Sequence, residues 1–135
     1  MKPFLDTNVL VYAALSDDPR RPTAERLLTS GGTISVQVLN EFVNVARGKL
    51  GWSWPDIETM LALVRSSSRR VLDLSVATHE AAIALARDHR LSFYDALIVA
   101  AAIQAGCDAL YTEDMQHGRK FGGLTIINPF VEGGG

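Results

Sequence analysis

Residues 3–10 read Pro-Phe-Leu-Asp-Thr-Asn-Val-Leu, so three polar residues join a short apolar run to a longer one. Asp6 follows the first run, and the second continues from Asn8 without a breaker. This pattern predicts a strand over 3–5, a sharp turn and then a helix, whose N-terminus Thr7 or Asn8 can cap. A strand that leads directly into a helix is typical of an α/β fold, here with an acid at the junction.

The rest of the chain alternates predicted strands and helices in the same way. Short β-branched and apolar runs predict further strands, and apolar residues at helical spacing predict further helices. The strands are expected over 33–36, 71–74, 109–112 and 124–127, and the helices over about 22–30, 38–48, 53–65, 79–88 and 93–105. Helical connections of this length favour a parallel sheet with helices on both faces. We therefore expect a three-layer α/β/α sandwich with a central, mainly parallel sheet of four to five strands.

The chain has the size of a single domain. Its 135 residues are 47% hydrophobic and 21% charged, which suits one packed core over residues 1–135, with the glycine-rich end at 133–135 frayed. The longest apolar run, from Ala96 to Ile103, is too short to cross a bilayer. With Cys107 as the one cysteine, no internal disulfide can form. These features predict a cytoplasmic protein without a membrane segment.

The charge balance limits how the chain could contact nucleic acid. It carries 13 Lys and Arg against 15 Asp and Glu, so its net charge is −2 and any contact with a polyanion must be local. Aromatic residues, at 7%, are too few for the stacking platforms that bind single strands. Four basic pairs are candidate phosphate contacts, although solvated surface positions explain most of them more simply: Arg20 and Arg21, Arg47 and Lys49, Arg69 and Arg70, and Arg119 and Lys120.

Four acidic residues lie in apolar or tightly structured surroundings. They are Asp6 after the first strand, Glu41 in the third helix, Asp95 at the start of the last helix and Asp114 after Thr112. A carboxylate among core elements costs free energy unless it is paired, neutral or bound to a cation. No Lys or Arg lies within a few residues of Asp6, Glu41 or Asp95, so a metal is the candidate cation. Hard oxygen ligands suit Mg²⁺ or Mn²⁺.

Each of these acids also has a simple structural explanation. Asp6 could cap the helix that follows it, and Asp114 could be a turn residue. The segment from Ser92 to Asp95 is close to a capping box, with the acid at the third helical position. Glu41 flanks the apolar stripe of its helix, where an acid commonly faces solvent. The occurrence of all four together favours the metal site.

Four stretches carry a more specific signal than any single acid. They are Phe4-Leu5-Asp6-Thr7-Asn8-Val9-Leu10, Ile34-Ser35-Val36-Gln37-Val38-Leu39-Asn40-Glu41-Phe42, Ser92-Phe93-Tyr94-Asp95-Ala96-Leu97-Ile98 and Leu110-Tyr111-Thr112-Glu113-Asp114-Met115. They span residues 4–115, which is most of the chain. In this order and at these intervals they resemble the PIN-domain nucleases, in particular the VapC-type toxins of VapBC toxin–antitoxin modules.

The resemblance implies a site and an activity. It implies an acidic quartet that binds one or two Mg²⁺ or Mn²⁺ ions, with nearby polar residues in support. The quartet is Asp6, Glu41, Asp95 and Asp114, the supporting residues are Thr7, Asn8 and Thr112, and Glu113 is a second candidate for the fourth ligand. The metal activates a water that hydrolyses an RNA phosphodiester, so no side-chain nucleophile is needed and the products carry 5′ phosphates.

The resemblance also implies partners. A VapC-type toxin is the endoribonuclease of a type II toxin–antitoxin pair, so a VapB-type antitoxin protein and a homodimer are expected beside the RNA substrate. An unusually apolar segment follows the third helix and contains Trp52, Trp54, Met60, Leu61 and Leu63. Core packing is its simpler explanation, and a groove for an amphipathic segment of the antitoxin is the alternative that the resemblance suggests.

Two other functions stay open at the level of sequence. The chain could be a PIN-like module that binds RNA or protein without cleaving anything. It could also be a phosphotransfer domain with Asp6 as nucleophile, although such phosphatases place a second acid two residues on, where Asn8 stands. The remaining reactive side chains carry no motif: His79, His89 and His117 lack metal-ligand spacing, and Cys107 is expected to be a buried small residue.

Overall fold

The structure is a computed structural model that describes residues 2–131, so the predicted frayed end at 133–135 lies outside the described residues. Its elements are β1 (Pro3–Leu5), α1 (Thr7–Ala14), α2 (Arg21–Thr29), β2 (Thr33–Ser35), α3 (Val36–Gly48), α4 (Trp54–Ser67), β3 (Arg70–Leu72), α5 (Val76–His89), α6 (Phe93–Gln104), β4 (Ala109–Tyr111), β5 (Lys120–Phe121) and β6 (Leu124–Ile127). All the helices and strands expected from the sequence are present within this part of the chain.

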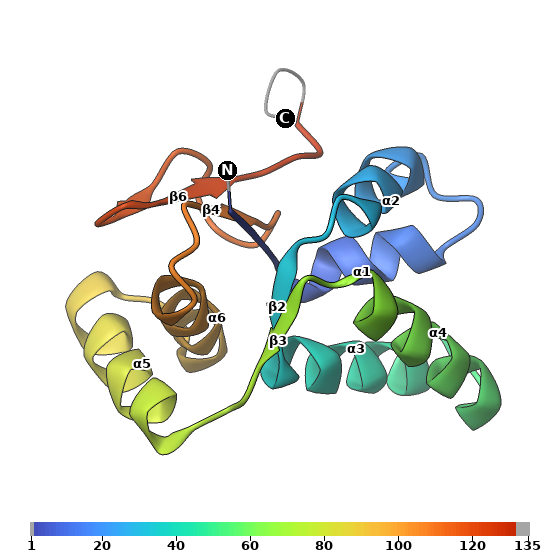
Figure 1. Cartoon of the computed structure of the whole chain (residues 1–135), viewed down its shortest axis with the longest axis horizontal. Coiled ribbons are helices and arrows are strands. Elements are labelled where there is room, and N and C mark those ends of the chain that lie inside the picture. The colour runs from blue at the N-terminus through green and yellow to red at the C-terminus, as the bar shows by residue number, and fades with distance from the viewer. Residues whose placement is uncertain (1, 132–135) are drawn as a thin grey trace.

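The strands form one six-stranded sheet in the order β3-β2-β1-β4-β6-β5. Every pairing is parallel except that of β5 with β6. Figure 1 shows α5 and α6 on one side of the sheet and α1 to α4 on the other, which confirms the three-layer α/β/α architecture. Because β2 and β4 lie on opposite sides of β1, the chain reverses its direction of winding between β1 and β4. In open α/β sheets, ligands bind at this point, beyond the carboxyl ends of the strands.

Side-chain caps determine where several helices begin. Ser35, Ser53, Ser75 and Ser92 each accept a hydrogen bond from the backbone N–H three residues on, at the N-termini of α3, α4, α5 and α6. The Ser75 cap starts α5 at Val76, earlier than the expected 79. Val76 is 73% exposed, so it does not belong to the apolar face that packs on the core.

The sheet has one strand more than the four to five expected. The extra strand, β5, is only two residues long and pairs with β6 across a turn at Gly122 and Gly123. Gly122 adopts a φ of 60°, a left-handed conformation that favours glycine. Two residues are too short to show an alternating pattern, so the sequence carried no strand signal here.

The core lies on both sides of the sheet. From Ala96 to Ala102 every residue of α6 is buried, as its nearly continuous apolar sequence predicts. The four alanines in this stretch let α5 and the sheet pack closely on opposite sides of α6. Cys107 is buried, as expected for a small apolar residue. In the described part of the chain, no helix combines the length and apolarity needed to span a membrane.

Gly32 allows a close approach between two segments of the core. A Cβ atom added at Gly32 would lie 2.7 Å from Cγ of the fully buried Leu5. We expect Gly32→Ala to lower the free energy of unfolding by about 1–3 kcal/mol, because Leu5 must move inside a packed core. Urea unfolding measures this change. Gly48→Ala is the matched control, since nothing lies within 4 Å of that Cβ position; equal urea midpoints for the two variants would contradict the prediction.

Candidate active site

Two of the predicted acids come together because β1 and β4 pair in parallel. Leu5 at the end of β1 lies opposite Tyr111 at the end of β4, so the chain leaves both strands at the same level. Asp6 therefore lies beside Thr112, whose Oγ1 donates a hydrogen bond of 2.8 Å to Asp6 Oδ2. Asp6 Oδ1 accepts a second bond, of 2.7 Å, from the backbone N–H of Thr7. Asp6 is thus the N-cap of α1 and also a buried acid at the winding reversal. The helix cap and the candidate metal ligand predicted for this residue are therefore compatible.

Glu41 and Asp95 reach the same region from two helices. Glu41, on α3, accepts a 3.0 Å hydrogen bond at Oε2 from the hydroxyl of Thr7, and this contact turns it toward Asp6 rather than toward solvent. Asp95 lies in the first turn of α6, where its backbone N–H donates to Oγ of Ser92 at 3.2 Å. The predicted cap is therefore present, and the Ser92 hydroxyl also bonds to the Asp95 carboxyl group, which lowers its pKa against the effect of burial.

The fourth acid, Asp114, is held by a short network on the loop after β4. Its Oδ2 accepts a 3.2 Å hydrogen bond from Nδ2 of Asn8, and its backbone N–H donates to Oγ1 of Thr112 at 3.0 Å. Asn8 also donates to Thr112 Oγ1 at 3.2 Å and accepts from the backbone N–H of Glu113. Thr112 and Asn8 thereby tie Asp114 to Asp6 and to the start of α1, which agrees with their predicted supporting role.

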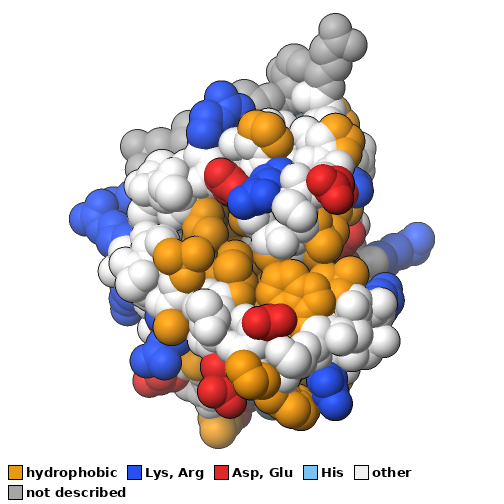
Figure 2. All heavy atoms as spheres, turned by 90° about the vertical axis from the view of Figure 1, so that its right-hand side faces the viewer, with side chains coloured by type: hydrophobic (Ala, Val, Ile, Leu, Met, Phe, Trp, Pro, Cys, Tyr) orange, Lys and Arg blue, Asp and Glu red, His pale blue; other side chains and the backbone are white. Residues whose placement is uncertain are grey.

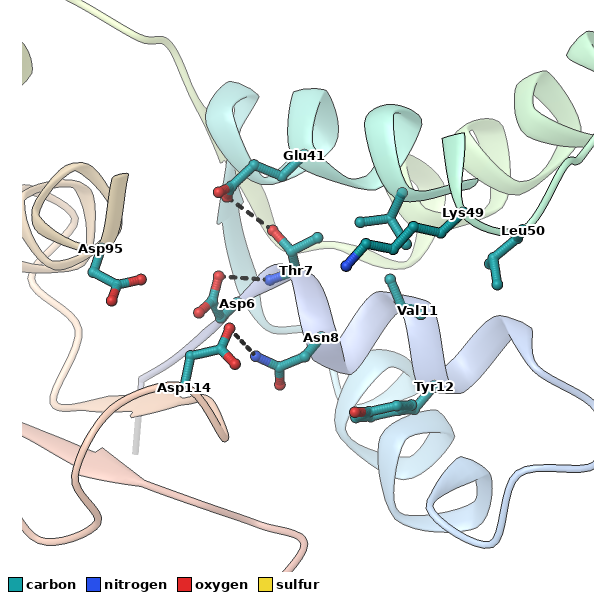
Figure 3. Close-up of a pocket in the computed structure, with 11 residues that line it drawn as sticks. Asp6, Thr7, Asn8, Val11, Tyr12, Glu41, Lys49, Leu50, Asp95 and Asp114 are labelled. Carbon is teal, nitrogen blue, oxygen red and sulfur yellow. Dashed lines mark hydrogen bonds between the residues drawn. The ribbon is translucent and has the colours of Figure 1, made fainter. Parts of the chain in front are cut away.

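These side chains line one cavity of about 370 Å³. Figure 3 shows the carboxylates of Asp6, Asp114, Asp95 and Glu41 arranged around its inner end. The lining residues are Asp6, Thr7, Asn8, Val11, Tyr12, Glu41, Val45, Lys49, Leu50, Asp95 and Asp114. Within residues 2–131, no three acidic, His or Cys side chains converge closely enough to hold one metal ion as they stand. The donor set is nevertheless all oxygen and all anionic, the chemistry that Mg²⁺ or Mn²⁺ selects.

Burial raises the pKa of three of the four carboxyl groups. Asp6 is only 3% exposed, and desolvation is the main cause that raises its pKa to about 7, against hydrogen bonds from Thr7 and Thr112 that lower it. Asp114 and Glu41 raise it further as like charges. Desolvation, followed by neighbouring carboxylates, also raises the pKa of Glu41 and of Asp95. Such a cluster is stabilised by a proton or by a cation.

Glu113 lies outside this cavity. Its carboxylate accepts a hydrogen bond from the hydroxyl of Tyr12 and lies 3.5 Å from the guanidinium of Arg20. Arg20 is further engaged with Asp18 and stacks on the Tyr12 ring, 3.6 Å from its centroid. The structure therefore places Asp114, rather than Glu113, with the other three acids. Arg20, expected as a candidate phosphate contact, is occupied by this ion-pair cluster.

Four lining residues were not singled out from the sequence, and a fifth, Lys49, was named there only with Arg47 as a candidate phosphate contact. Val11, Tyr12, Val45, Lys49 and Leu50 form the outer part of the cavity. They come from α1 and from the C-terminal end of α3, two helices that pack together. Apolar residues in these helices carry the same periodicity as core residues, so only the packing of α1 on α3 shows which of them border the cavity.

Comparison with known proteins identifies the family. A family model described as PIN domain matches residues 4–120. The chain belongs to the PIN domain family. PIN domains are generally nucleases that use divalent metal ions. No curated protein matches the sequence significantly.

Solved structures with the same fold include components of toxin–antitoxin systems. VapC20 of Mycobacterium tuberculosis, described as a sarcin-ricin loop cleaving toxin, is 25% identical with a TM-score of 0.70, over 84% of this chain and 90% of that one. A DNA-bound VapBC of Salmonella typhimurium is 26% identical with a TM-score of 0.61, over 93% and 96%. A toxin–antitoxin complex from Klebsiella pneumoniae shares the fold at 22% identity, with a TM-score of 0.69 over 96% and 98%. These neighbours confirm the resemblance to VapC-type toxins.

The strand order of this PIN domain argues against a phosphotransfer domain of the receiver type. Receiver sheets place the first strand between the second and third strands. Here β1 lies between β2 and β4. Asn8, where phosphatases of this kind carry a second acid, instead joins Asp114 to Thr112. Asp6 in this family is therefore not expected to act as a nucleophile.

The apolar segment around α4 is partly core and partly surface. Ile57 and Val64 are buried, whereas Trp54 and Leu63 are 50% and 55% exposed. A shallow groove of about 280 Å³ lies over this helix, lined by Trp52, Asp56, Thr59, Met60 and Leu63. Figure 2, which faces the side of the molecule that bears α2 and α4, shows apolar side chains gathered in the middle of this face with charged side chains around them.

The raised pKa of Asp6 predicts a pH dependence of stability in the metal-free chain. Asp6 titrates near its ordinary 3.8 when unfolded and near 7 when folded. Its stabilising protonation is complete below about pH 4 and is lost as the pH rises through about 7. The free energy of unfolding in chelator should therefore fall over this range, with Asp6 contributing at most about 1.4 kcal/mol per pH unit.

Urea unfolding at several pH values, in wild type and in Asp6→Asn, measures this contribution. The variant should show the weaker pH dependence, because it lacks the contribution of Asp6. The contributions of Glu41 and Asp95, which have the same sign, remain in both proteins. Glu58→Gln, which changes an exposed acid on α4, should behave as wild type. Identical slopes for wild type and Asp6→Asn would show that Asp6 does not titrate in this window.

Proposed function

We propose that this PIN domain is a divalent-metal-dependent endoribonuclease and the toxin of a type II toxin–antitoxin pair. The observation that carries the proposal is the convergence of four carboxylates on one cavity at the winding reversal of the sheet. They come from four separate segments, at Asp6, Glu41, Asp95 and Asp114, and the pKa of three of them is raised. Burial of several like charges is costly unless a cation compensates for it.

The four acids would hold one or two Mg²⁺ or Mn²⁺ ions. Asp6 is the innermost ligand, and its orientation is set by Thr7 and Thr112. When bound, the metal supplies an activated water for in-line attack and neutralises charge that develops on the leaving oxygen. Asp95 and Glu41 face each other across the cavity from opposite helical layers, so they would border a phosphodiester from its two sides (Figure 3).

The polar residues around the quartet would keep these ligands oriented. Thr112 donates to Asp6 and accepts from Asn8 and from the backbone of Asp114, so one hydroxyl sets the relative position of two acids. Thr7 orients Glu41 in the same way. Hydrogen bonds thus hold Asp6, Glu41 and Asp114 through oxygens that retain a second lone pair for a cation.

The toxin role rests on the relatives rather than on the cavity. Two of the neighbouring structures are toxin–antitoxin assemblies, and VapC20 is described as a sarcin-ricin loop cleaving toxin. We infer by analogy an RNA substrate, a VapB-type antitoxin protein as partner, a homodimer and a cytoplasmic location. The groove over α4 suits an amphipathic segment of the antitoxin.

Metal binding should stabilise the folded chain. At a free Mg²⁺ or Mn²⁺ concentration about 100 times the dissociation constant, mass action adds roughly 2.7 kcal/mol to the free energy of unfolding. Thermal unfolding after chelator treatment and metal addition measures the effect. Asp6→Asn should lose most of it, whereas Glu58→Gln should retain it. An unchanged melting temperature in wild type up to tens of millimolar metal would argue against the quartet as a metal site.

Cleavage should depend on both the metal and the quartet. The chelator-stripped chain is incubated with a pool of structured RNAs, with and without Mn²⁺, and the product ends are mapped. We expect Mn²⁺-dependent cuts that leave 5′ phosphates. Asp95→Asn should reduce the rate by about a hundredfold or more, since it removes a metal ligand while Ser92 still caps α6. Glu58→Gln is the control for the loss of a carboxylate elsewhere.

The same assay distinguishes the alternative of a non-cleaving binding module. Such a module would bind metal and RNA through the same cavity without metal-dependent products. Equal RNA binding by wild type and Asp95→Asn, with no cleavage by either, would therefore support the binding module and contradict the nuclease.

A further inference from the structure

The cavity that contains the quartet has two chemically different halves. The inner half presents the four carboxylates, and the outer half is bordered by side chains from α1 and the end of α3. These are Val11, Tyr12, Val45, Lys49 and Leu50. The two halves belong to one cavity, and Figure 3 shows the acids on one side of Thr7 with Val11, Lys49 and Leu50 on the other. A pocket needed only to hold metal ions would not require this apolar extension.

Lys49 is the single Lys or Arg among the residues that line this cavity. Figure 3 shows its side chain extending back from the end of α3, with the ammonium directed toward Thr7. Lys49 forms no salt bridge with any described residue, although acids lie in the same cavity. Its neighbour Arg47 is engaged differently, because it donates to the carbonyl oxygen of Trp52 and lies over the ring of Trp54.

Several of the other basic residues singled out from the sequence are occupied by partners within the chain. Arg20 pairs with Asp18 and Glu113, Arg21 pairs with Glu25, and Arg119 donates to the carbonyl oxygen of His89. Lys49 is therefore the cation that remains available at the site. An unpaired ammonium beside a cluster of carboxylates fits an anionic ligand that enters between them.

We propose that the outer half of the cavity is a nucleotide subsite. Lys49 binds a phosphate adjacent to the scissile one, and the apolar wall of Val11, Val45 and Leu50 receives the neighbouring base. This assignment rests on the proposed nuclease function and specifies how its substrate is held. The whole cavity, with both halves, measures about 370 Å³ and is near the lower end for small-ligand pockets, so it has room for a single nucleotide but not for a helix.

The subsite implies a requirement on the structure of the substrate. A base can enter an apolar wall only when it is unstacked from its neighbours, because bases inside an RNA helix are stacked and paired. The apolar wall carries few groups that could distinguish bases by hydrogen bonding. The subsite therefore selects for a displaced nucleotide more than for its identity.

Mononucleotide binding separates the contributions of phosphate and base. The probes are the four nucleoside 5′-monophosphates, the corresponding nucleosides, and ribose 5-phosphate, each titrated in Mg²⁺ and followed by amide chemical shifts. Lys49→Gln should weaken binding of the monophosphates by about threefold to tenfold and leave nucleoside binding unchanged. Leu50→Ala should weaken monophosphates and nucleosides by about threefold and leave ribose 5-phosphate unchanged. Arg47→Gln is the matched control and should bind all probes as wild type does.

Two results would overturn the subsite. One is binding of monophosphates by Lys49→Gln with wild-type affinity, and the other is the absence of any monophosphate-induced shift in residues of this cavity. The RNA cleavage assay provides an independent readout, in which Lys49→Gln should raise KM by about threefold to tenfold with little change in kcat. Failure of wild type to cleave RNA would refute the nuclease but not the binding result, so the two proposals fail separately.

Discussion

The parallel pairing of β1 with β4 is the constraint on which the rest of the site depends. It brings Asp6 and Thr112 to the same level at the carboxyl edge of the sheet, where they form a hydrogen bond at the end of the core. Asp6 is consequently buried, and its carboxylate cannot be solvated by bulk water. The other three acids, together with Thr7 and Asn8, are arranged around this one buried charge. Without the pairing, Thr112 would not bond to Asp6, and Asp6 would lose its link to Asp114 through this residue.

The stability of the fold and the chemistry of the site therefore oppose each other at this edge. The hydrogen bonds from Thr7 and Thr112 favour the charged form of Asp6, while burial and the neighbouring acids favour the protonated form. Burial has the larger effect. Natural proteins retain such a destabilised group where it has a function, and a hard cation in the cavity would resolve the conflict.

Much of this arrangement was predictable from residues 3–10 and from the periodicity of the helices. A strand, an acid and a capped helix in direct succession are compatible with few folds other than α/β. Asp95 and Glu41 were ambiguous by themselves, since a capping acid and a flanking acid have ordinary structural roles. The packing of α3 and α6 against β2, next to β1 in the sheet, brings both acids to the cavity that Asp6 lines. The sequence favoured Asp114 and kept Glu113 as an alternative, because the partners of Glu113, Tyr12 and Arg20, lie far away in the chain. Lys49 was a candidate phosphate contact from the sequence, whereas the position of Leu50 at the cavity was hidden for the same reason.

The hydrogen bond between Asp6 and Thr112 joins residues 106 positions apart. Contacts of such long sequence separation form late, after the cost in loop entropy has been met. During synthesis Asp6 leaves the ribosome before Thr112 and Asp114 do, so the acids have no common cavity until β4 has emerged and docked beside β1. The order of synthesis thus delays completion of the site.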